Sequence, residues 1–228
     1  MAAPESGHVN SLPLHGQSLK LGGRPRTAPR PTMPISEFRE AQERYARIRR
    51  SVYDAVQDLV SREWALPAAV HLTDIDGYAL ETRRLTWTFP HWSGSGGWDW
   101  DALVRPVLRR PSGLPLAVWS GDQLLGLAIG RASKRRAWGR HHTLSIHFVE
   151  THPDPRHPLR SHILEIVFEA AEQYGRALGA ERLRLVAPLP ALMPLYLRTR
   201  FEIAGRHGHA LYLERAIIGR APEDRNHP

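Results

Sequence analysis

Residues 143–201 carry the most informative pattern in the chain and read TLSIHFVETHPDPRHPLRSHILEIVFEAAEQYGRALGAERLRLVAPLPALMPLYLRTRF. They predict a strand over Thr143–Glu150, an amphipathic helix from about Leu159 to Leu178, a second strand over Arg182–Ala187 and a short helical segment that ends at Phe201. This order is a β-loop-α-β-α unit, in which a strand leads to the N-terminus of a helix. Proteins often bind phosphate groups at such a terminus, because unpaired backbone N–H groups and the positive end of the helix dipole meet there.

The residues before this unit predict a run of antiparallel strands. Leu114–Trp119 and Gln123–Arg131 are apolar runs joined by a Ser-Gly-Asp turn at 120–122, which indicates a β-hairpin. With the strand that follows, they form a meander of three strands. Tyr78–Thr88 also predicts a strand, and a final strand is expected near His209–Glu214. The chain is therefore predicted to be α+β, with a mixed, mostly antiparallel central sheet and flanking helices.

The segment between the first two predicted strands is rich in glycine and tryptophan over residues 91–100. It predicts either a loop whose tryptophans dock on the core or a substrate lid. Asp99 or Asp101 is expected to start a short helix that runs through Val107.

An extra amphipathic helix is predicted over residues 35–66, ahead of the sheet. Ser36 is a plausible N-cap, and the apolar residues recur at steps of three and four until the helix ends before Pro67. This stripe comprises Phe38, Ala41, Tyr45, Ile48, Val52, Val56 and Leu59. The helix either packs against the body of the protein or pairs with a second chain, so a homodimer stays open.

The two ends of the chain differ in composition from the rest. Residues 1–34 are rich in Pro, Gly and Ser, carry several basic residues and have no apolar core of the secretory type. The predicted organisation is a disordered basic arm (1–34), an N-terminal helix (35–66), an α+β domain (67–218) and a tail (219–228).

Composition limits the compartment and the partners. The formal charge of +8 favours anionic partners such as nucleic acid, acidic proteins or a phosphate-bearing cofactor. The chain has no cysteine, which excludes disulfides and thiolate metal sites, and we expect a reducing, cytoplasmic compartment. No apolar run approaches the length that spans a bilayer, so no membrane partner is expected.

The order of elements and two short segments together carry a family resemblance. Residues 195–201 read LYLRTRF, and the loop before the long helix reads RHPLRSH from Arg156. With these segments in place, residues 70–218 resemble the GNAT superfamily of acyl-CoA-dependent N-acyltransferases. The resemblance implies acetyl-CoA or another acyl-CoA as co-substrate, and an amine acceptor that is a small molecule, a peptide or a protein.

The resemblance also implies where the diphosphate of CoA binds. In the family, a loop of the form R/Q-x-x-G-x-G/A holds it through backbone N–H groups. One register of the present loop puts Leu159 and Ser161 at the glycine positions, and another puts Pro158 and Arg160 there. Arginine contacts would replace the lost backbone donors. The implied cofactor-binding residues are Phe148, Val149, Arg156, Leu159, Arg160, Ser161 and His162.

An acid and a base complete the implied site. The family motif L-Y-x-x-x-G-F implies Tyr196 as the general acid that protonates the departing thiolate, with Arg200 in place of the glycine. A base must deprotonate the incoming ammonium group, and Glu150 and His147 are the candidates near the end of the central strand. They lie three residues apart, so on a regular strand their side chains point to opposite faces and only one faces the cleft.

Five histidines recur at intervals of five residues, at positions 142, 147, 152, 157 and 162. This spacing matches neither the period of a strand nor that of a helix, so the side chains do not share one face. No metal site is expected from them.

The sequence thus favours an N-acyltransferase, with acetyl as the most frequent acyl group in the family. Two alternatives stay open. One is a catalytically inactive GNAT-fold protein with a binding or regulatory role, because the loop lacks its glycines. The other is a nucleic-acid-associated protein that uses the basic arm.

Overall fold

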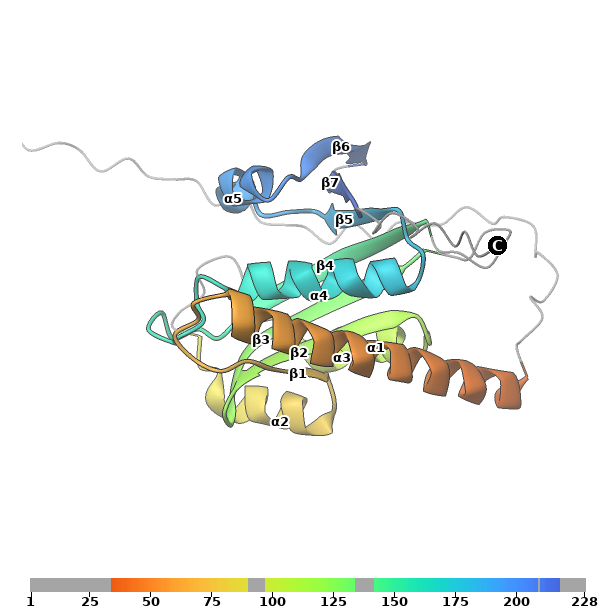
Figure 1. Cartoon of the computed structure of the whole chain (residues 1–228), viewed down its shortest axis with the longest axis horizontal. Helices are drawn as coiled ribbons and strands as arrows, with labels where there is room; N and C mark the ends of the chain where they lie inside the picture. Colours follow the sequence, from red (N-terminus) through yellow and green to blue (C-terminus); the bar gives the residue numbers. More distant parts are fainter. Residues whose placement is uncertain (1–33, 90–96, 134–141, 209, 218–228) are drawn as a thin grey trace, which may run out of the picture. The chain divides into compact units, whose positions relative to one another are not determined.

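The computed structural model describes residues 34–89, 97–133, 142–208 and 210–217. A seven-stranded sheet with the order β1-β2-β3-β4-β5-β7-β6 organises this part of the chain (Figure 1). The only parallel pair of neighbours in this sheet is β4 and β5. The strands are β1 (His71–Asp74), β2 (Gly113–Ser120), β3 (Gln123–Ala132), β4 (Thr143–Thr151), β5 (Arg182–Val186), β6 (Glu202–His207) and β7 (Ala210–Ala216).

Helices cover both faces of the sheet, and each face has its own apolar core. On one face, α1 and α4 lie side by side over strands β2 to β5 (Figure 1). On the other face, α2 and α3 cover a smaller cluster built around Trp100, Trp119 and Ile129. The helices are α1 (Ile35–Glu63), α2 (Gly77–Thr86), α3 (Trp100–Leu108), α4 (Ile163–Ala177), the 3-10 turn η2 (Pro190–Leu192) and α5 (Met193–Arg198). The mixed, mostly antiparallel sheet with flanking helices confirms the predicted fold class, and its element order agrees with the GNAT resemblance.

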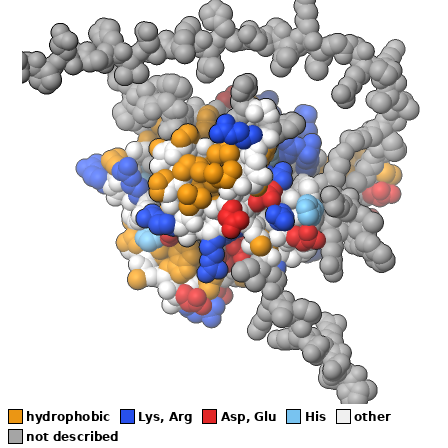
Figure 2. Space-filling model, turned by 90° about the horizontal axis from the view of Figure 1, so that it is seen from above, with side chains coloured by type: hydrophobic (Ala, Val, Ile, Leu, Met, Phe, Trp, Pro, Cys, Tyr) orange, Lys and Arg blue, Asp and Glu red, His pale blue; other side chains and the backbone are white. Residues whose placement is uncertain are grey.

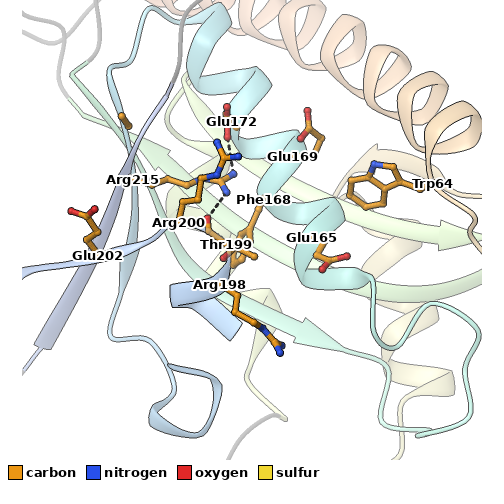
Figure 3. Close-up of a pocket in the computed structure, with 11 residues that line it drawn as sticks. Trp64, Glu165, Phe168, Glu169, Glu172, Arg198, Thr199, Arg200, Glu202 and Arg215 are labelled. Carbon is orange, nitrogen blue, oxygen red and sulfur yellow. Dashed lines mark hydrogen bonds and ion pairs between the residues drawn. The ribbon is translucent and has the colours of Figure 1, made fainter. Parts of the chain in front are cut away.

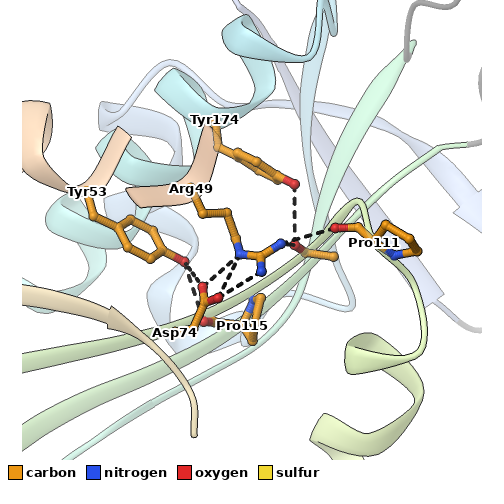
Figure 4. A network of polar contacts seen from close by, with 7 residues as sticks. Arg49, Tyr53, Asp74, Pro111, Pro115 and Tyr174 are labelled. Carbon is orange, nitrogen blue, oxygen red and sulfur yellow. Dashed lines mark hydrogen bonds and ion pairs between the residues drawn. The ribbon is translucent and has the colours of Figure 1, made fainter. Parts of the chain in front are cut away.

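The extra N-terminal helix packs against the body of the protein through a polar anchor (Figure 4). The buried Arg49 guanidinium of α1 donates to the Asp74 carboxylate of β1, with Nε–Oδ1 at 2.7 Å. It also donates to the carbonyl oxygens of Pro111 and Gly113, and the Tyr53 hydroxyl donates to Asp74 at 3.0 Å. A buried ion pair is tolerated only when such extra hydrogen bonds satisfy both charges. This network therefore fixes the orientation of α1 against β1 and β2.

Several predicted boundaries are corrected by the structure. The strand predicted over Tyr78–Thr88 is wrong: these residues as far as Thr86 belong to α2, whose N-terminus is capped by the Asp76 side chain, which accepts from the Ala79 N–H at 2.8 Å. Helix α1 begins at Ile35 after Pro34, so Ser36 lies inside the helix and is not its N-cap.

Other elements were missed or misplaced by a few residues. The short strands β1 and β6 were not predicted. Helix α4 begins at Ile163, and the residues from Leu159 to His162 form turns before it. Helix α3, capped by Asp99, confirms the short helix expected in this region.

Some predictions fall on residues outside those described. They are the basic arm, the first part of the glycine-rich segment and the C-terminal tail. Among the described helices, none combines the length and the apolar character that crossing a bilayer requires.

One face of the molecule carries hydrophobic side chains gathered among arginines and acidic residues (Figure 2). The exposed large hydrophobic residues in the C-terminal part are Leu189, Leu197 and Ile203, of which Ile203 is 64% exposed. The homodimer left open by the sequence stays a prediction.

Candidate active site between strands β4 and β5

The parallel strands β4 and β5 separate halfway along their length. They pair from Thr143 and Arg182 to Ile146 and Leu185, whereas β4 continues to Thr151. Beyond this point each strand follows its other neighbour. The last residues of β4 stay paired with β3, and the Ala187 N–H after β5 donates to Leu211 O of β7 at 2.9 Å.

Ala187 has an unusual backbone conformation close to this separation. Its φ of 50° lies in the left-handed region, which is unusual for a residue with a Cβ atom. Strained backbone of this kind concentrates at functional sites, where the surrounding structure holds it in place. Here it lies two residues after Leu185, the last residue of β5 that pairs with β4.

A cavity of about 320 Å³ occupies the gap between the two strands. It passes between residues of the α4 face, such as Val149 and Leu164, and residues of the opposite face, Trp98 and Phe148. The walls are mainly apolar, which suits a chain of methylene and amide groups. The full lining is Trp98, Ile146, His147, Phe148, Val149, Leu164, Phe168, Leu185, Val186, Ala187, Pro188, Leu189, Leu192 and Tyr196.

His147 occupies a β-bulge at the point of separation. Phe148 pairs with Ile129 and Ile146 pairs with Gly130, so His147 is the extra residue in β4. Bulges are frequent next to active sites because they redirect side chains. This one shifts the alternation, so that Ile146 packs with the core under α4 and Phe148 with the cluster under α2 and α3.

The protonation state of His147 suits a base. Burial lowers the pKa of His147, and the positive charges of Arg131 and Arg110 lower it further. A lowered pKa keeps the imidazole neutral near pH 7, so one ring nitrogen retains a lone pair that can accept a proton.

Tyr196 lies on α5 and reaches the same cavity. Its side chain is buried, and its ring packs against Phe168 with centroids 6.2 Å apart. Burial raises the pKa of Tyr196, although a hydrogen bond with the Leu189 backbone opposes this effect. The hydroxyl therefore stays protonated at neutral pH, as a proton donor must.

Glu150 has a different environment from His147. Its carboxylate accepts from Arg83 Nη2 at 3.0 Å, from Trp100 Nε1 at 2.5 Å and from the backbone N–H groups of Gly97 and Trp98. The residue is only 4% exposed and does not line the cavity. With both oxygens engaged in this way, Glu150 joins α2 and the start of α3 to β4.

The Glu150 contacts also place Trp98 at the cavity. The Trp98 ring meets Phe148 edge to face, with centroids 5.0 Å apart and an interplanar angle of 75°. Of the two readings of the tryptophan-rich segment, the described part from Gly97 onward agrees with a loop whose tryptophan docks on the core.

None of residues 156–162, the predicted diphosphate loop, lines the cavity between β4 and β5. Arg156 is exposed, pairs with Asp154 at 3.3 Å and lines a different cavity of about 290 Å³ together with His157. The Leu159 side chain is fully buried in the core. The N–H groups of Arg160 and His162 donate to the carbonyl oxygens of His157 and Leu159, so these two amides already have acceptors.

Donors for a phosphate remain at the start of α4. The Ile163 N–H donates to the Leu159 carbonyl at 3.0 Å, and the N-cap residue His162 makes no side-chain cap hydrogen bond, so the first-turn N–H groups that remain as donors are those of Leu164 and Glu165. Arg160 is exposed and uses Nη1 on the Pro155 carbonyl at 3.1 Å, which leaves other guanidinium donors. Ser161 is exposed beside it, and Leu164 of the same turn lines the cavity between the strands.

A larger cavity of about 480 Å³ lies between α4, α5 and β7, and it contains none of the predicted site residues (Figure 3). Its lining contains several charged side chains, and some of these charges neutralise each other in ion pairs. Arg215 pairs with Glu172 at 2.7 Å, donates to the Thr199 carbonyl and lies over the ring of Phe201. We therefore describe this cavity as a charged groove beside the candidate active site.

Sequence reasoning missed part of the lining. Phe168 and Leu185 were not predicted as site residues, and they pack in the core while also lining the cavity. Arg131 was read as the end of a strand. Nothing in the local sequence distinguishes these residues from ordinary core and surface positions.

Comparison with known proteins gives matches among solved structures alone. No protein-family model matches the chain, and no curated protein sequence matches it. One similar structure is the ribosomal-protein-S18-alanine N-acetyltransferase from Escherichia coli, with 16% identity, a TM-score of 0.48, and coverage of 68% of this chain and 97% of that chain. Another is the aminoglycoside 6'-N-acetyltransferase from Enterococcus faecium, with 13% identity, a TM-score of 0.46 and coverage of 65% and 98%.

A third is the PaiA N-acetyltransferase from Thermoplasma acidophilum in complex with coenzyme A, with 11% identity, a TM-score of 0.43 and coverage of 64% and 98%. These similarities concern the fold alone. They assign no activity, cofactor or acceptor to it.

Proposed function

We propose that the chain is an acyl-CoA-dependent N-acyltransferase, with acetyl-CoA as the first co-substrate to test. The observation that carries this proposal is the cavity in the gap between β4 and β5, which brings together His147, Tyr196 and the first turn of α4. Thioester aminolysis requires a proton acceptor for the amine and a proton donor for the thiolate, and His147 and Tyr196 can fill these roles. The apolar channel and the helix N-terminus can hold the co-substrate.

The residues present fit a CoA thioester at three points. The apolar walls formed by Ile146, Val149 and Leu185 accommodate the pantetheine chain. The first-turn amides of α4, with the Arg160 guanidinium, are the donors for the diphosphate. This assignment keeps Arg160, Ser161 and His162 near the cofactor, and it places Leu159 in the supporting core.

The chemistry divides between two side chains. His147 takes a proton from the acceptor ammonium group, directly or through a water molecule, and the free amine attacks the thioester carbonyl. A C–N bond forms, and the nitrogen releases its second proton to solvent. The C–S bond breaks, and Tyr196 donates its proton to the departing thiolate. His147 then loses its proton to solvent, and Tyr196 takes one up from solvent. We assign Glu150 a positioning role, because its oxygens are held by Arg83, Trp100 and the Gly97 amide.

Binding of the co-substrate is tested by thermal unfolding with and without acetyl-CoA. At a concentration 100-fold above Kd, a ligand of the native state stabilises it by about 2.7 kcal/mol. For a domain of this size this corresponds to a rise in Tm of about 5–10 °C. No rise at millimolar acetyl-CoA would refute the proposal and favour the binding or regulatory alternative.

Turnover is tested separately by following release of the CoA thiol in the presence of amines. The Tyr196→Phe variant should lose at least about tenfold in kcat and keep the Tm rise with acetyl-CoA, because the hydroxyl acts on the leaving group. Tyr212→Phe is the matched control, since Tyr212 lies on β7 outside the lining of the cavity. Equal activity of Tyr196→Phe and the control would remove Tyr196 from the mechanism.

The nucleic-acid alternative has its own test. Retention of DNA at physiological salt that is lost on removal of residues 1–34 would support it.

A further inference from the structure

Two arginines flank the part of the sheet next to His147 on its α2 and α3 face, and neither of them lines the cavity itself. Ile129 packs in the cluster of that face, and Arg131 follows two residues later on β3, so its side chain leaves the sheet on the same side. Arg131 pairs with Ser145 of β4, close to the bulge at His147. It also pairs with Gly113 of β2.

Arg110 reaches the same place from the turn after α3. The Gly113 N–H donates to the Arg110 carbonyl at 2.9 Å, which holds Arg110 next to the strand position that pairs with Arg131. Within the described ranges, neither guanidinium makes an ion pair with a carboxylate. Burial is the main cause of the lowered pKa of His147, and the positive charges of Arg131 and Arg110 lower it further.

An acceptor that approaches from this face meets an aromatic wall and positive charge. Trp98 and Phe148 form the wall at this end of the cavity, and His147 lies at the bulge between the strands. Two cations that form no ion pair with a described carboxylate disfavour an acceptor that carries further positive charge and favour one that carries an anion. Guanidinium groups bind carboxylate and phosphate oxygens through charge-assisted hydrogen bonds.

We propose that the acceptor is a small amine that also carries an anionic group, which Arg131 and Arg110 bind while the amine lies at His147. This inference rests on the acyltransferase function proposed above and narrows its substrate class. The anion is a carboxylate or a phosphate. Amines with several positive charges, such as diamines, are disfavoured acceptors.

The experiment compares amines of matched length in the acetyl-CoA thiol-release assay. β-Alanine, β-alaninamide and 1,3-diaminopropane present a carboxylate, a neutral amide and a second ammonium group on the same short chain. O-phosphoethanolamine and ethanolamine test phosphate in the same way. We expect kcat/KM for the anionic member of at least one series to exceed that of its neutral partner by about tenfold or more, as charge-assisted contacts typically give.

Variants then assign the preference to the two arginines. Arg131→Gln should reduce the ratio of anionic to neutral amine to near one, and the exposed Arg110→Gln should reduce it in the same direction. The Tm rise with acetyl-CoA shows that each variant folds and binds its donor. Arg206→Gln, an exposed arginine on β6 at the far edge of the sheet, is the matched control and should keep the full ratio.

The outcomes separate this inference from the function on which it rests. Stabilisation by acetyl-CoA together with a preference for neutral or doubly charged amines overturns the inference and leaves the acyltransferase proposal intact. A preference for anions that survives in both arginine variants also overturns it. Absence of both stabilisation and thiol release refutes the proposed function, and this inference falls with it.

Discussion

Replacing Glu150 with Gln tests whether this residue anchors the site or serves as its base. The substitution keeps the size of the side chain and removes its charge. The carboxylate accepts from Arg83, from the Trp100 indole and from the Gly97 and Trp98 amides. A glutamine offers one acceptor oxygen, and its NH₂ group would face one of these donors. The structure therefore predicts a loss of stability as well as a change in activity.

The magnitude follows from the ion pair that is broken. Arg83 is 14% exposed at its side chain, and Glu150 is 3% exposed. Removing one partner of a buried ion pair typically costs about 3–5 kcal/mol. Arg83 retains its contact over the Trp87 ring and some access to water, so we expect the lower end, about 3 kcal/mol. For a domain of this size the fall in Tm is about 6–12 °C.

The assay combines urea unfolding with steady-state kinetics. If Glu150 positions Trp98 at the cavity, Glu150→Gln should raise KM for the acceptor, and the acid limb of the pH–rate profile should persist because His147 still titrates. Glu165→Gln is the control, since this glutamate is 43% exposed and should change stability by less than about 0.5 kcal/mol. A Glu150→Gln protein that unfolds like the wild type, loses more than tenfold in kcat and loses the acid limb would refute the reasoning and identify Glu150 as the base.

Two further predictions concern stability. Burial is the first cause that lowers the pKa values of His147 and His157, so the unfolded chain binds protons more readily than the native one. The free energy of unfolding should therefore fall as the pH drops through about 6.5, by at most about 1.4 kcal/mol per pH unit for each histidine, and a urea midpoint that stays constant from pH 8 to pH 5 would contradict this. Arg200→Gly should stabilise the protein by about 0.5–1 kcal/mol in urea unfolding, because Arg200 has a φ of 65° and the left-handed region costs about 1–2 kcal/mol for a residue with a Cβ atom. Arg198→Gly, inside α5, should instead destabilise it by about 1 kcal/mol, and equal effects of the two changes would show that strain is not the cause.

The predicted elements that succeeded depend on local signals. The hairpin at Gly121 and the β-α-β unit follow from turn chemistry and from the apolar period over short windows. The strand predicted over Tyr78–Thr88 failed because its apolar residues were given more weight than the cap signal of Asp76. These residues are Ala79, Leu80, Leu85 and Trp87. The competing signal was present in the sequence, since an Asp immediately before a helical segment is a typical N-cap.

The site was predictable only where a motif covered it. The LYLRTRF segment identified Tyr196, and the position of Arg200 in the left-handed region explains why a glycine suits that place in the motif. The environment of Glu150 was not predictable, because the residues that hold it lie about 50 positions or more away in the sequence. The same holds for Arg131 and Arg110, whose relation to His147 depends on sheet register.

The gap between β4 and β5 itself argues for a ligand. Neighbouring strands of a sheet normally pair along their common length, because unpaired backbone N–H and C=O groups in a buried place cost about 1–3 kcal/mol each. Here β4 continues from His147 to Thr151 beyond its last pair with β5, and the left-handed Ala187 holds β5 with β7. A partner with its own amide groups, lying lengthwise between the strands, would satisfy the β4 backbone as a neighbouring strand does. Under the proposed function, the left-handed Ala187 and the open edge of β4 would be two parts of one binding site.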